Sequence, residues 1–282
     1  MKIIGVIGAG IMGAGIAQVA AENGYTVKIY DVAASMMDKA VKTMQKNWQK
    51  AVEKGKSTQE DMDKQVAAVT CVNSVDELND VDLVIEAVAE NMELKKSILA
   101  QLDKICGEKT ILATNTSTLP VTEIAGATNR PDRVVGMHFF NPVPMMKLVE
   151  IVRPSGTSNE TLAAVTDFAE NIKKTAVIAK DTPGFIVNRV LTPPIIEAMT
   201  AYGDGVASAG DIDIAMKLGC NWPIGPLALA DMIGLDTLLA GAETFVREFG
   251  DQKYRPPHVL RQMVRAGEFG MKTGKGFYDY KK

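Results

Sequence analysis

The amino-acid sequence predicts an α/β fold, in which a doubly wound, mostly parallel β-sheet is followed by an all-helical C-terminal domain. Three observations lead to this prediction. Short β-rich runs alternate with helical periodicity as far as Ala179, a glycine-rich turn follows the first of these runs, and the chain beyond residue 184 has a helical pattern throughout. Alternation of strands and helices is typical of parallel strands joined by helical crossovers.

The predicted strands are short runs rich in valine and isoleucine. Most are continuously apolar instead of alternating, as a sheet covered on both faces requires. They are Ile3–Ile7, Thr26–Tyr30, Val81–Val88, Thr110–Thr114, Val134–Phe139, Leu148–Val152 and Lys174–Ala179. Between them, apolar residues at three- and four-residue spacing predict helices. These helices are Gly13–Glu22, Met36–Lys54, Met92–Ile105 and Asn159–Ile172.

The second half of the pattern begins at Asp181-Thr182-Pro183-Gly184, where a polar cap and a proline in a first-turn position predict the start of a helix. Four further predicted helices each end at a glycine that suits a left-handed helix terminus. They are Asp211–Leu218 with Gly219, Pro226–Ile233 with Gly234, Leu235–Phe249 with Gly250, and Pro257–Ala266 with Gly267. We therefore expect two domains, residues 1–183 and residues 184–282.

Composition excludes several classes of function. The 282 residues carry 31 basic and 34 acidic side chains, for a net charge of −3, so no basic field is present to bind nucleic acid. The longest apolar runs are far shorter than the roughly 20 residues that cross a bilayer, and the chain enters a strand directly instead of a signal peptide. We expect a cytoplasmic protein with neither nucleic acid nor membrane as a partner.

Cysteine and histidine are too sparse to predict a metal site. Three cysteines, Cys71, Cys106 and Cys220, lack the C-x-x-C spacing of thiolate zinc sites and do not suggest a disulfide framework. The two histidines, His138 and His258, lie far apart in sequence and have different neighbours. Few side chains are therefore available for acid–base chemistry near neutral pH.

The glycine-rich turn Gly8-Ala9-Gly10-Ile11-Met12-Gly13 matches the dinucleotide-binding pattern G-x-G-x-x-G and lies between a predicted strand and a predicted helix. In this pattern the first glycine permits a tight turn, the second allows the backbone to approach a pyrophosphate, and the third allows close packing of helix on strand. The helix N-terminus also favours phosphate. The predicted sheet is therefore of the Rossmann type.

Asp31 supports this interpretation, because it ends the second predicted strand, where a carboxylate can accept hydrogen bonds from the ribose hydroxyls of an adenosine. The same charge repels a 2′-phosphate, and Val32 and Ala33 follow where an NADP site would place a guanidinium, so NAD is favoured as the cofactor. The alternative is that the glycines only form a sharp turn and that Asp31 only caps a helix.

Polar residues follow two predicted strands at the edge where a nicotinamide would bind. Asn115-Thr116-Ser117 follows one strand, and His138 ends another, before Asn141. A histidine in this place can take a proton from a substrate hydroxyl while the nicotinamide takes the hydride. Glu150, on the next strand, could hold the other ring nitrogen, as the acid of a catalytic triad does. The alternative is a histidine with a purely structural role.

Taken together, these motifs resemble the L-3-hydroxyacyl-CoA dehydrogenase family. The resemblance covers nearly the whole chain, and the length, without a fused hydratase domain, is similar to the short bacterial members that act on 3-hydroxybutyryl-CoA. It rests on Gly8–Gly13, Asn115–Ser117, His138–Glu150, Asp181–Arg189, Gly210–Asp213, Pro226–Asp231 and Lys272–Tyr278.

The resemblance implies a role for each matched residue. His138 would be the general base and Glu150 its partner, and Ser117 and Asn188 would hydrogen-bond the substrate and complete the catalytic set. The implied cofactor-binding residues are Gly8, Gly10, Ile11, Met12, Gly13, Asp31, Glu90, Lys95, Asn115, Ser117, Asn141 and Lys272. The implied coenzyme A site is the basic segment Lys46, Lys50, Lys54, Lys56 and Ser57, for which a solvated charged face is the alternative.

The implied function is the reversible, NAD-dependent oxidation of (S)-3-hydroxybutyryl-CoA to acetoacetyl-CoA. One alternative is a 6-phosphogluconate-like β-hydroxyacid dehydrogenase, which uses a catalytic lysine where this chain has Asn188 and no lysine. Another is a non-catalytic NAD-binding protein, either crystallin-like or a redox sensor. The apolar segments Leu191–Ile196 and Pro226–Ala230 predict a homodimer through the helical domain, with higher homo-oligomers left open.

Overall fold

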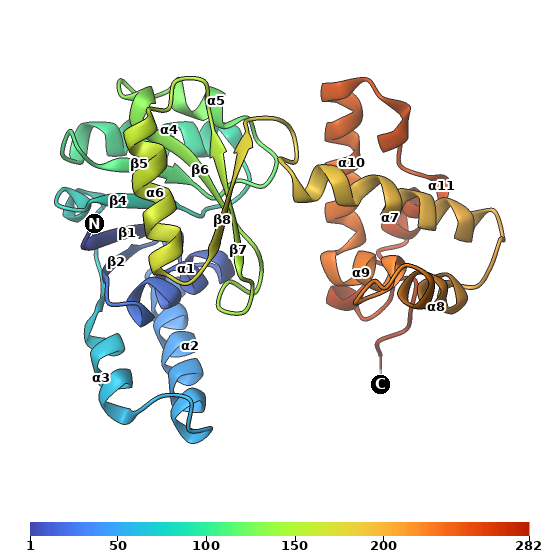
Figure 1. Ribbon diagram of the computed structural model, residues 1–282, viewed down its shortest axis with the longest axis horizontal. Coiled ribbons are helices and arrows are strands. Elements are labelled where there is room, and N and C mark those ends of the chain that lie inside the picture. The colour runs from blue at the N-terminus through green and yellow to red at the C-terminus, as the bar shows by residue number, and fades with distance from the viewer. Residues whose placement is uncertain (282) are drawn as a thin grey trace. The chain divides into compact units, whose positions relative to one another are not determined.

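The computed structural model describes residues 1–281. The chain divides into two compact units, Met1–Thr182 and Pro183–Lys282, and each has a hydrophobic core of its own (Figure 1). Within the described residues, no helix combines the length and the apolar character that a bilayer crossing needs.

The first unit is built on one eight-stranded sheet with the order β3-β2-β1-β4-β5-β6-β7-β8. All neighbouring strands are parallel except β6 and β7, which are antiparallel. The predicted mostly parallel sheet is therefore confirmed. The strands are β1 (Ile3–Ile7), β2 (Thr26–Tyr30), β3 (Val69–Cys71), β4 (Leu83–Glu86), β5 (Ile111–Thr114), β6 (Val134–Phe139), β7 (Leu148–Arg153) and β8 (Thr175–Lys180).

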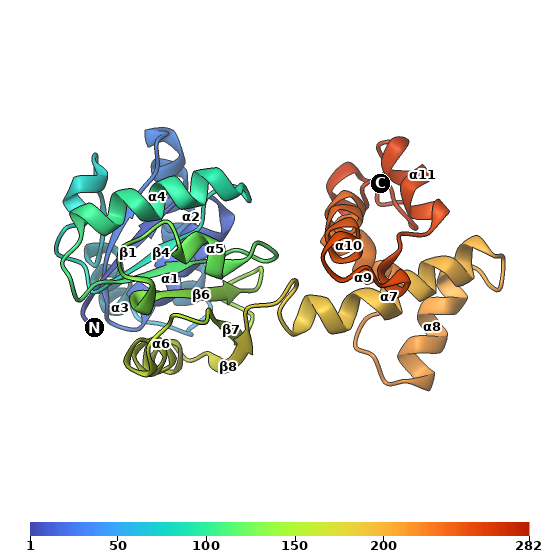
Figure 2. The ribbon, with the colours of Figure 1, turned by 90° about the horizontal axis from the view of Figure 1, so that it is seen from above.

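Helices cover both faces of this sheet, as Figure 2 shows for α4 on one side and α6 on the other. One core cluster joins the sheet to Ile16 of α1, Met44 of α2 and Phe168 of α6, and a second joins it to Leu99 of α4 and Ile124 of α5. The helices are α1 (Ile11–Glu22), α2 (Ala34–Glu53), α3 (Gln59–Ala67), α4 (Met92–Ile105), α5 (Val121–Ala125) and α6 (Asn159–Asn171).

The sequence analysis missed α3, β3 and α5. None of the residues of α3 is buried, and the half-buried Met62 and Val66, which pack against the core, form too narrow an apolar stripe for periodicity to detect. Its visible signal is the capping box at its start, where the Thr58 hydroxyl accepts from the Asp61 amide and the Asp61 carboxylate accepts from the Thr58 amide. The other two elements, three and five residues long, are too short to show a period.

The second unit is all-helical, as predicted. Its core is formed by Met199 of α7, Leu227 of α9, Leu235 of α10 and Leu260 of α11, each of which is at most 1% exposed. The helices are α7 (Val187–Gly203), α8 (Ala209–Gly219), α9 (Pro226–Ile233), α10 (Leu235–Phe249) and α11 (His258–Arg265).

Two predicted helix boundaries in this unit are wrong. The helix predicted to begin at Pro183 begins at Val187, because Gly184 and Phe185 have φ values of +72° and +48°, which a right-handed helix does not contain. Gly219 is the last residue of α8, and the left-handed position falls instead on Asn221, with φ of +55°.

The other three glycines that were predicted to end helices, Gly234, Gly250 and Gly267, have positive φ. Gly250 and Gly267 lie in the left-handed region, with φ values of +64° and +74°, as their helix ends predict. Gly234 differs, since its ψ of 122° takes it out of that region and its φ of 105° suits glycine alone.

Candidate functional site

The glycine turn joins the end of β1 to the start of α1, and the surrounding backbone explains two of its three glycines. Gly8 has φ of +96°, and a Cβ there would lie 2.6 Å from the Ala87 carbonyl oxygen. A Cβ on Gly13 would lie 1.7 Å from the Gly8 carbonyl oxygen. These two positions therefore accept only glycine because of the protein's own packing.

Gly10 differs, because nothing lies within 4 Å of the position that its Cβ would take. It is the N-cap residue of α1, no side chain caps this helix, and its first turn contains no acidic residue. The start of α1 is therefore open beside Gly10 and lies in a positive potential, as a pyrophosphate requires. The residues present fit a dinucleotide cofactor.

Asp31, which follows β2, is fixed against the glycine turn. Its Oδ2 accepts from the Ala9 amide at 2.7 Å, and its Oδ1 accepts from the Ala33 amide at 2.9 Å. Each carboxylate oxygen can accept a further hydrogen bond, so ribose hydroxyls could still bind here. A cavity of about 540 Å³ adjoins Asp31, with Val32 and Ile98 in its mainly apolar lining, and this volume suits an adenosine.

Glu90 organises the segment that follows β5. Its Oε1 accepts from the Thr116 hydroxyl at 2.6 Å, from the Ser117 amide at 2.9 Å and from the Thr118 amide at 3.2 Å, and its Oε2 lies 3.4 Å from the Lys95 ammonium. Burial opposes ionisation of Glu90, but Lys95 and these hydrogen bonds outweigh it and hold the pKa of Glu90 below its usual 4.5.

This lowered pKa gives a pH-dependent contribution to stability. Because the folded pKa lies below the unfolded one, the contribution is complete above pH 4.5 and is lost as pH falls through the folded value. We expect Glu90→Gln to lower the free energy of unfolding near neutral pH by at most about 1 kcal/mol, since the side chain is 37% exposed. Denaturant titrations at several pH values measure this difference, which should shrink below pH 4.5; a constant difference would contradict the assignment.

Lys95 is 1% exposed and contacts Glu86, a residue that the sequence analysis missed. Glu86 ends β4, is fully buried, and lies 2.8 Å from the Lys95 ammonium. The available signal was an acidic residue at the end of an otherwise apolar strand, because a charge in that position needs a partner.

His138 and Glu150 form a hydrogen-bonded pair. They are directly opposed in the antiparallel register of β6 and β7, and His138 Nδ1 lies 2.6 Å from Glu150 Oε2. The exposed fractions are 6% for His138 and zero for Glu150, and the ring of Phe140 lies 4.5 Å from the imidazole. This contact fixes the orientation of the imidazole, whose Nε2 lies on the side of the ring away from Glu150.

The two predicted asparagines of the first unit, Asn115 and Asn141, follow the strands β5 and β6. Asn115 follows β5, and its Oδ1 accepts from the Phe139 amide at 2.9 Å, next to His138. Asn141 is exposed in the loop between β6 and β7. Lys174 holds that loop, because its buried ammonium donates to the carbonyl oxygens of Val143 and Met146, at 2.5 and 2.6 Å.

The predicted coenzyme A residues lie where α2 ends. Lys46 and Lys50 belong to α2, and Lys54, Lys56 and Ser57 follow it before α3. The four lysines are exposed, and Figure 1 shows this end of α2 projecting beyond the sheet. These four lysines are therefore accessible to solvent.

The other two predicted site residues belong to the second unit. Asn188 is the second residue of α7, and its backbone carbonyl accepts from the Thr192 hydroxyl at 2.7 Å. The Lys272 ammonium pairs with Asp236 and lies 5.6 Å from the centre of the Phe269 ring.

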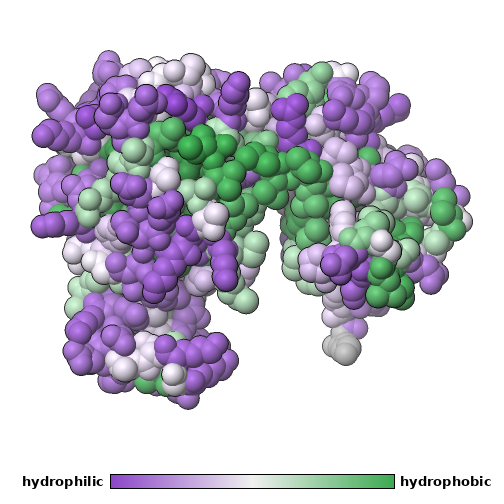
Figure 3. All heavy atoms as spheres, in the orientation of Figure 1, coloured by the Kyte–Doolittle hydropathy of each residue, from purple (hydrophilic) through white to green (hydrophobic). Residues whose placement is uncertain are grey.

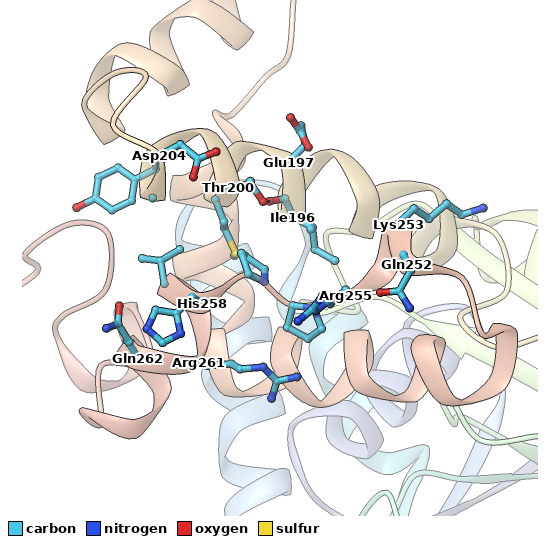
Figure 4. Close-up of a pocket in the computed structure, with 16 residues that line it drawn as sticks. Ile196, Glu197, Thr200, Asp204, Gln252, Lys253, Arg255, His258, Arg261 and Gln262 are labelled. Carbon is cyan, nitrogen blue, oxygen red and sulfur yellow. The ribbon is translucent and has the colours of Figure 1, made fainter.

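The helical unit also contains a hollow of about 840 Å³, between α7, α11 and the segment that precedes α11 (Figure 4). Neither Asn188 nor Lys272 lines it. Glu197 of α7 and Asp204, which caps the end of α7, line it together with His258 and Arg261 of α11, so charges of both signs are present. The hollow therefore favours neither an anion nor a cation.

Comparison with known proteins gives matches along almost the whole chain. Residues 3–182 match the family model described as 3-hydroxyacyl-CoA dehydrogenase, NAD binding domain, and residues 184–280 match the model described as 3-hydroxyacyl-CoA dehydrogenase, C-terminal domain.

Individual proteins are similar over the same length. A 3-hydroxybutyryl-CoA dehydrogenase of Clostridioides difficile is 48% identical over 99% of both chains. The mitochondrial hydroxyacyl-coenzyme A dehydrogenase of Sus scrofa is 43% identical over 100% of this chain and 92% of the relative. The crystal structure of an (S)-3-hydroxybutyryl-CoA dehydrogenase from Ralstonia eutropha has a TM-score of 0.98, at 48% identity and with 100% of both chains covered.

Proposed function

We propose, since this chain belongs to the 3-hydroxyacyl-CoA dehydrogenase family, that it catalyses the reversible NAD-dependent oxidation of (S)-3-hydroxybutyryl-CoA to acetoacetyl-CoA. The observation that carries the proposal is the pair formed by His138 and Glu150. His138 lies one residue before the carboxyl end of β6, in the same sheet whose glycine turn fits a dinucleotide. Chemistry in such sheets occurs at the carboxyl ends of strands.

In the direction of oxidation, His138 Nε2 removes the proton from the 3-hydroxyl group. The nicotinamide, when bound, accepts the hydride from C3 of the substrate. Glu150 Oε2 receives the Nδ1 proton in a hydrogen bond, which selects the tautomer with a basic Nε2 and stabilises the imidazolium that forms. In reduction, the same imidazolium returns its proton to the oxygen at C3.

The other predicted residues bind and orient the reactants. Ser117 and Asn188 donate hydrogen bonds to the substrate oxygen and polarise the C3 carbonyl in reduction. The cofactor is held by Gly8–Gly13 and Asp31 and, around the nicotinamide, by the residues that the family resemblance implies. Those are Glu90, Asn115, Ser117, Asn141 and Lys272, together with Lys95, which is 1% exposed and acts through its contact with Glu90.

Residues 1–183 form the NAD-binding domain in this proposal, and residues 184–282 form the substrate-binding and dimerisation domain. Lys50, Lys54, Lys56 and Ser57 bind the phosphates of coenzyme A, and the exposure of the three lysines suits groups that stay partly hydrated.

Two observations favour the proposed function over the two alternative functions. A 6-phosphogluconate-like enzyme requires a catalytic lysine on the helix that carries Asn188, and the sequence of α7 contains no lysine. A non-catalytic NAD-binding protein would bind NADH without consuming it, yet the ordered contact of His138 with Glu150 supports catalysis.

The test is NADH consumption with acetoacetyl-CoA, run beside a β-hydroxyacid substrate and a series of longer 3-ketoacyl-CoA thioesters. We expect turnover with acetoacetyl-CoA and NADH, and much less with NADPH, because Asp31 would repel a 2′-phosphate. NADH binding without turnover of any thioester would refute the proposed activity.

The proposal includes a homodimer formed through the helical unit, with the cytoplasm as its location. The apolar segments from which it was predicted largely serve the core of the unit itself, where Ile195, Leu227 and Ala230 are buried. Exposed apolar side chains on α8 support self-association instead, since Ile214 is 55% exposed and Leu218 is 83% exposed. Figure 3 shows hydrophobic side chains on the surface of this helix. Sedimentation equilibrium would measure the mass, and a monomer at micromolar concentration would contradict this part of the proposal.

A further inference from the structure

Glu86 is a carboxylate with no exposed surface, at the carboxyl end of β4. Its Oε1 accepts from the Lys95 ammonium at 2.8 Å and from the Val88 amide at 2.7 Å. Its Oε2 accepts from the Thr114 hydroxyl at 2.6 Å and from Lys95 again at 3.1 Å. Four contacts, from α4, β5 and the loop after β4, thus fix this side chain in a single position.

Lys95 extends this arrangement away from the sheet core. Its ammonium is held by both oxygens of Glu86 and lies 3.4 Å from Glu90 Oε2. Glu90 in turn holds the amide of Ser117 at 2.9 Å. A continuous series of charged contacts therefore runs from the end of β4 to the segment that follows β5.

The three charged side chains of this series differ in how exposed they are. Glu90 is 37% exposed, whereas Lys95 and Glu86 are 1% and 0% exposed. Only Glu90 and the segment containing Ser117 therefore present a substantial surface to a ligand. A buried ammonium needs carboxylate partners, and the two shortest carboxylate contacts of Lys95 are with Glu86, at 2.8 and 3.1 Å, so the position of Lys95 depends chiefly on Glu86.

We propose that Glu86 is a positioning residue for the cofactor: it fixes Lys95, and through Lys95 it fixes Glu90 and Ser117. This inference rests on the proposed function, because Glu90, Lys95 and Ser117 are its nicotinamide-side residues. Glu86 acts through the lysine and does not itself touch substrate or cofactor.

A double-mutant cycle tests this dependence, with Glu86→Gln, Lys95→Gln and the double variant. The measured quantity is the dissociation constant for NADH, from fluorescence titration without any acyl substrate. We expect each single variant to weaken NADH binding by about tenfold, and the double variant to be no weaker than the worse single one, because both act through one contact.

Two results would overturn the inference. One is unchanged NADH affinity in a folded Glu86→Gln variant. The other is additivity, with the double variant weakened by the product of the two single effects, since Lys95 would then bind the cofactor independently of Glu86.

Kinetics separate a positioning role from a general loss of structure. We expect Glu86→Gln to raise KM for NADH about tenfold and KM for acetoacetyl-CoA by less, because Ser117 is the one member of the series that also contacts the substrate. An equal rise in both KM values would count against the inference.

A milder variant covers the case in which Glu86→Gln does not fold. Thr114→Val removes one hydrogen bond to Glu86 and leaves all three charges in place. We expect it to weaken NADH binding by a few-fold, and Thr114→Ser to restore wild-type affinity because the hydroxyl returns. A Thr114→Val protein with wild-type affinity would count against the inference.

The matched control is Asp103→Asn, which alters a second buried ion pair of α4. Asp103 lies near the C-terminal end of that helix, 2.6 Å from Arg130. This variant should lower thermal stability without changing NADH affinity. An equal loss of NADH affinity would show that general destabilisation of α4 explains the Glu86 effect.

Measurements on the wild-type protein separate failure of the proposed function from failure of the positioning role of Glu86. A wild-type chain that neither binds NADH nor reduces acetoacetyl-CoA would refute the proposed function. A wild-type chain that does both, with Glu86 variants that behave like it, would refute the positioning role alone.

Discussion

Replacing His138 with glutamine is expected to lower kcat by about a thousandfold while NADH affinity stays within about twofold of wild type. The imidazole is the proposed proton acceptor, and glutamine can keep a hydrogen bond to Glu150 without acting as a base. Stopped-flow or steady-state NADH consumption gives kcat, and fluorescence titration gives the NADH dissociation constant. A loss of less than about tenfold in kcat would refute the assignment of the general base.

His258→Gln provides the matched control, because the chain has only two histidines. His258 lies in the helical unit at the start of α11, and neither the proposed catalytic set nor the cofactor set includes it. Its replacement should leave kcat unchanged. Glu150→Gln should fall between the two variants, since it removes the charge that stabilises imidazolium but leaves the imidazole in place.

The cofactor half of the site could be predicted from the sequence because its geometry is local. The spacing of Gly8, Gly10 and Gly13 and the position of Asp31 follow from a single strand–turn–helix–strand unit. The strand that contains His138 next to its end could be predicted in the same way, since a polar residue near the end of an apolar run marks the end of a buried strand.

The contact of His138 with Glu150 depends on strand direction, which the alternation of strands and helices did not provide. Their direct pairing requires β6 and β7 to be antiparallel. The signal was the short connection between Phe139 and Leu148, which leaves no room for the helical crossover that a parallel pair needs. An antiparallel pair can then place side chains opposite each other on one face.

Glu86 and the start of α7 show what sequence patterns do not contain. The partner of Glu86 is nine positions away on a different element, so only the folded structure reveals that its charge is matched. The helix start predicted at Pro183 was displaced by left-handed backbone at Phe185, a non-glycine residue whose conformation no local propensity predicts. Both features depend on tertiary contacts that local sequence patterns do not contain.

Gly13→Ala is expected to destabilise the protein, whereas Gly10→Ala is expected to weaken NADH binding at nearly unchanged stability, although the two positions lie three residues apart in one turn. At Gly13 the added Cβ would lie 1.7 Å from the Gly8 carbonyl oxygen, so the turn must distort. We expect a loss of at least about 3 kcal/mol in the free energy of unfolding, together with loss of NADH binding. Thermal and denaturant unfolding measure the first quantity, and fluorescence titration measures the second.

At Gly10 the backbone has φ of −69° and no atom lies within 4 Å of the added Cβ, so the protein itself tolerates alanine. Its stability should stay within about 0.5 kcal/mol of wild type, as for the exposed control Gly219→Ala. The new methyl group would instead occupy the space where the pyrophosphate approaches, so NADH affinity should fall between about tenfold and about a hundredfold. If Gly10→Ala bound NADH as tightly as Gly219→Ala does, the open space beside Gly10 would not be the phosphate site, and the fit of the dinucleotide to this turn would have to be abandoned.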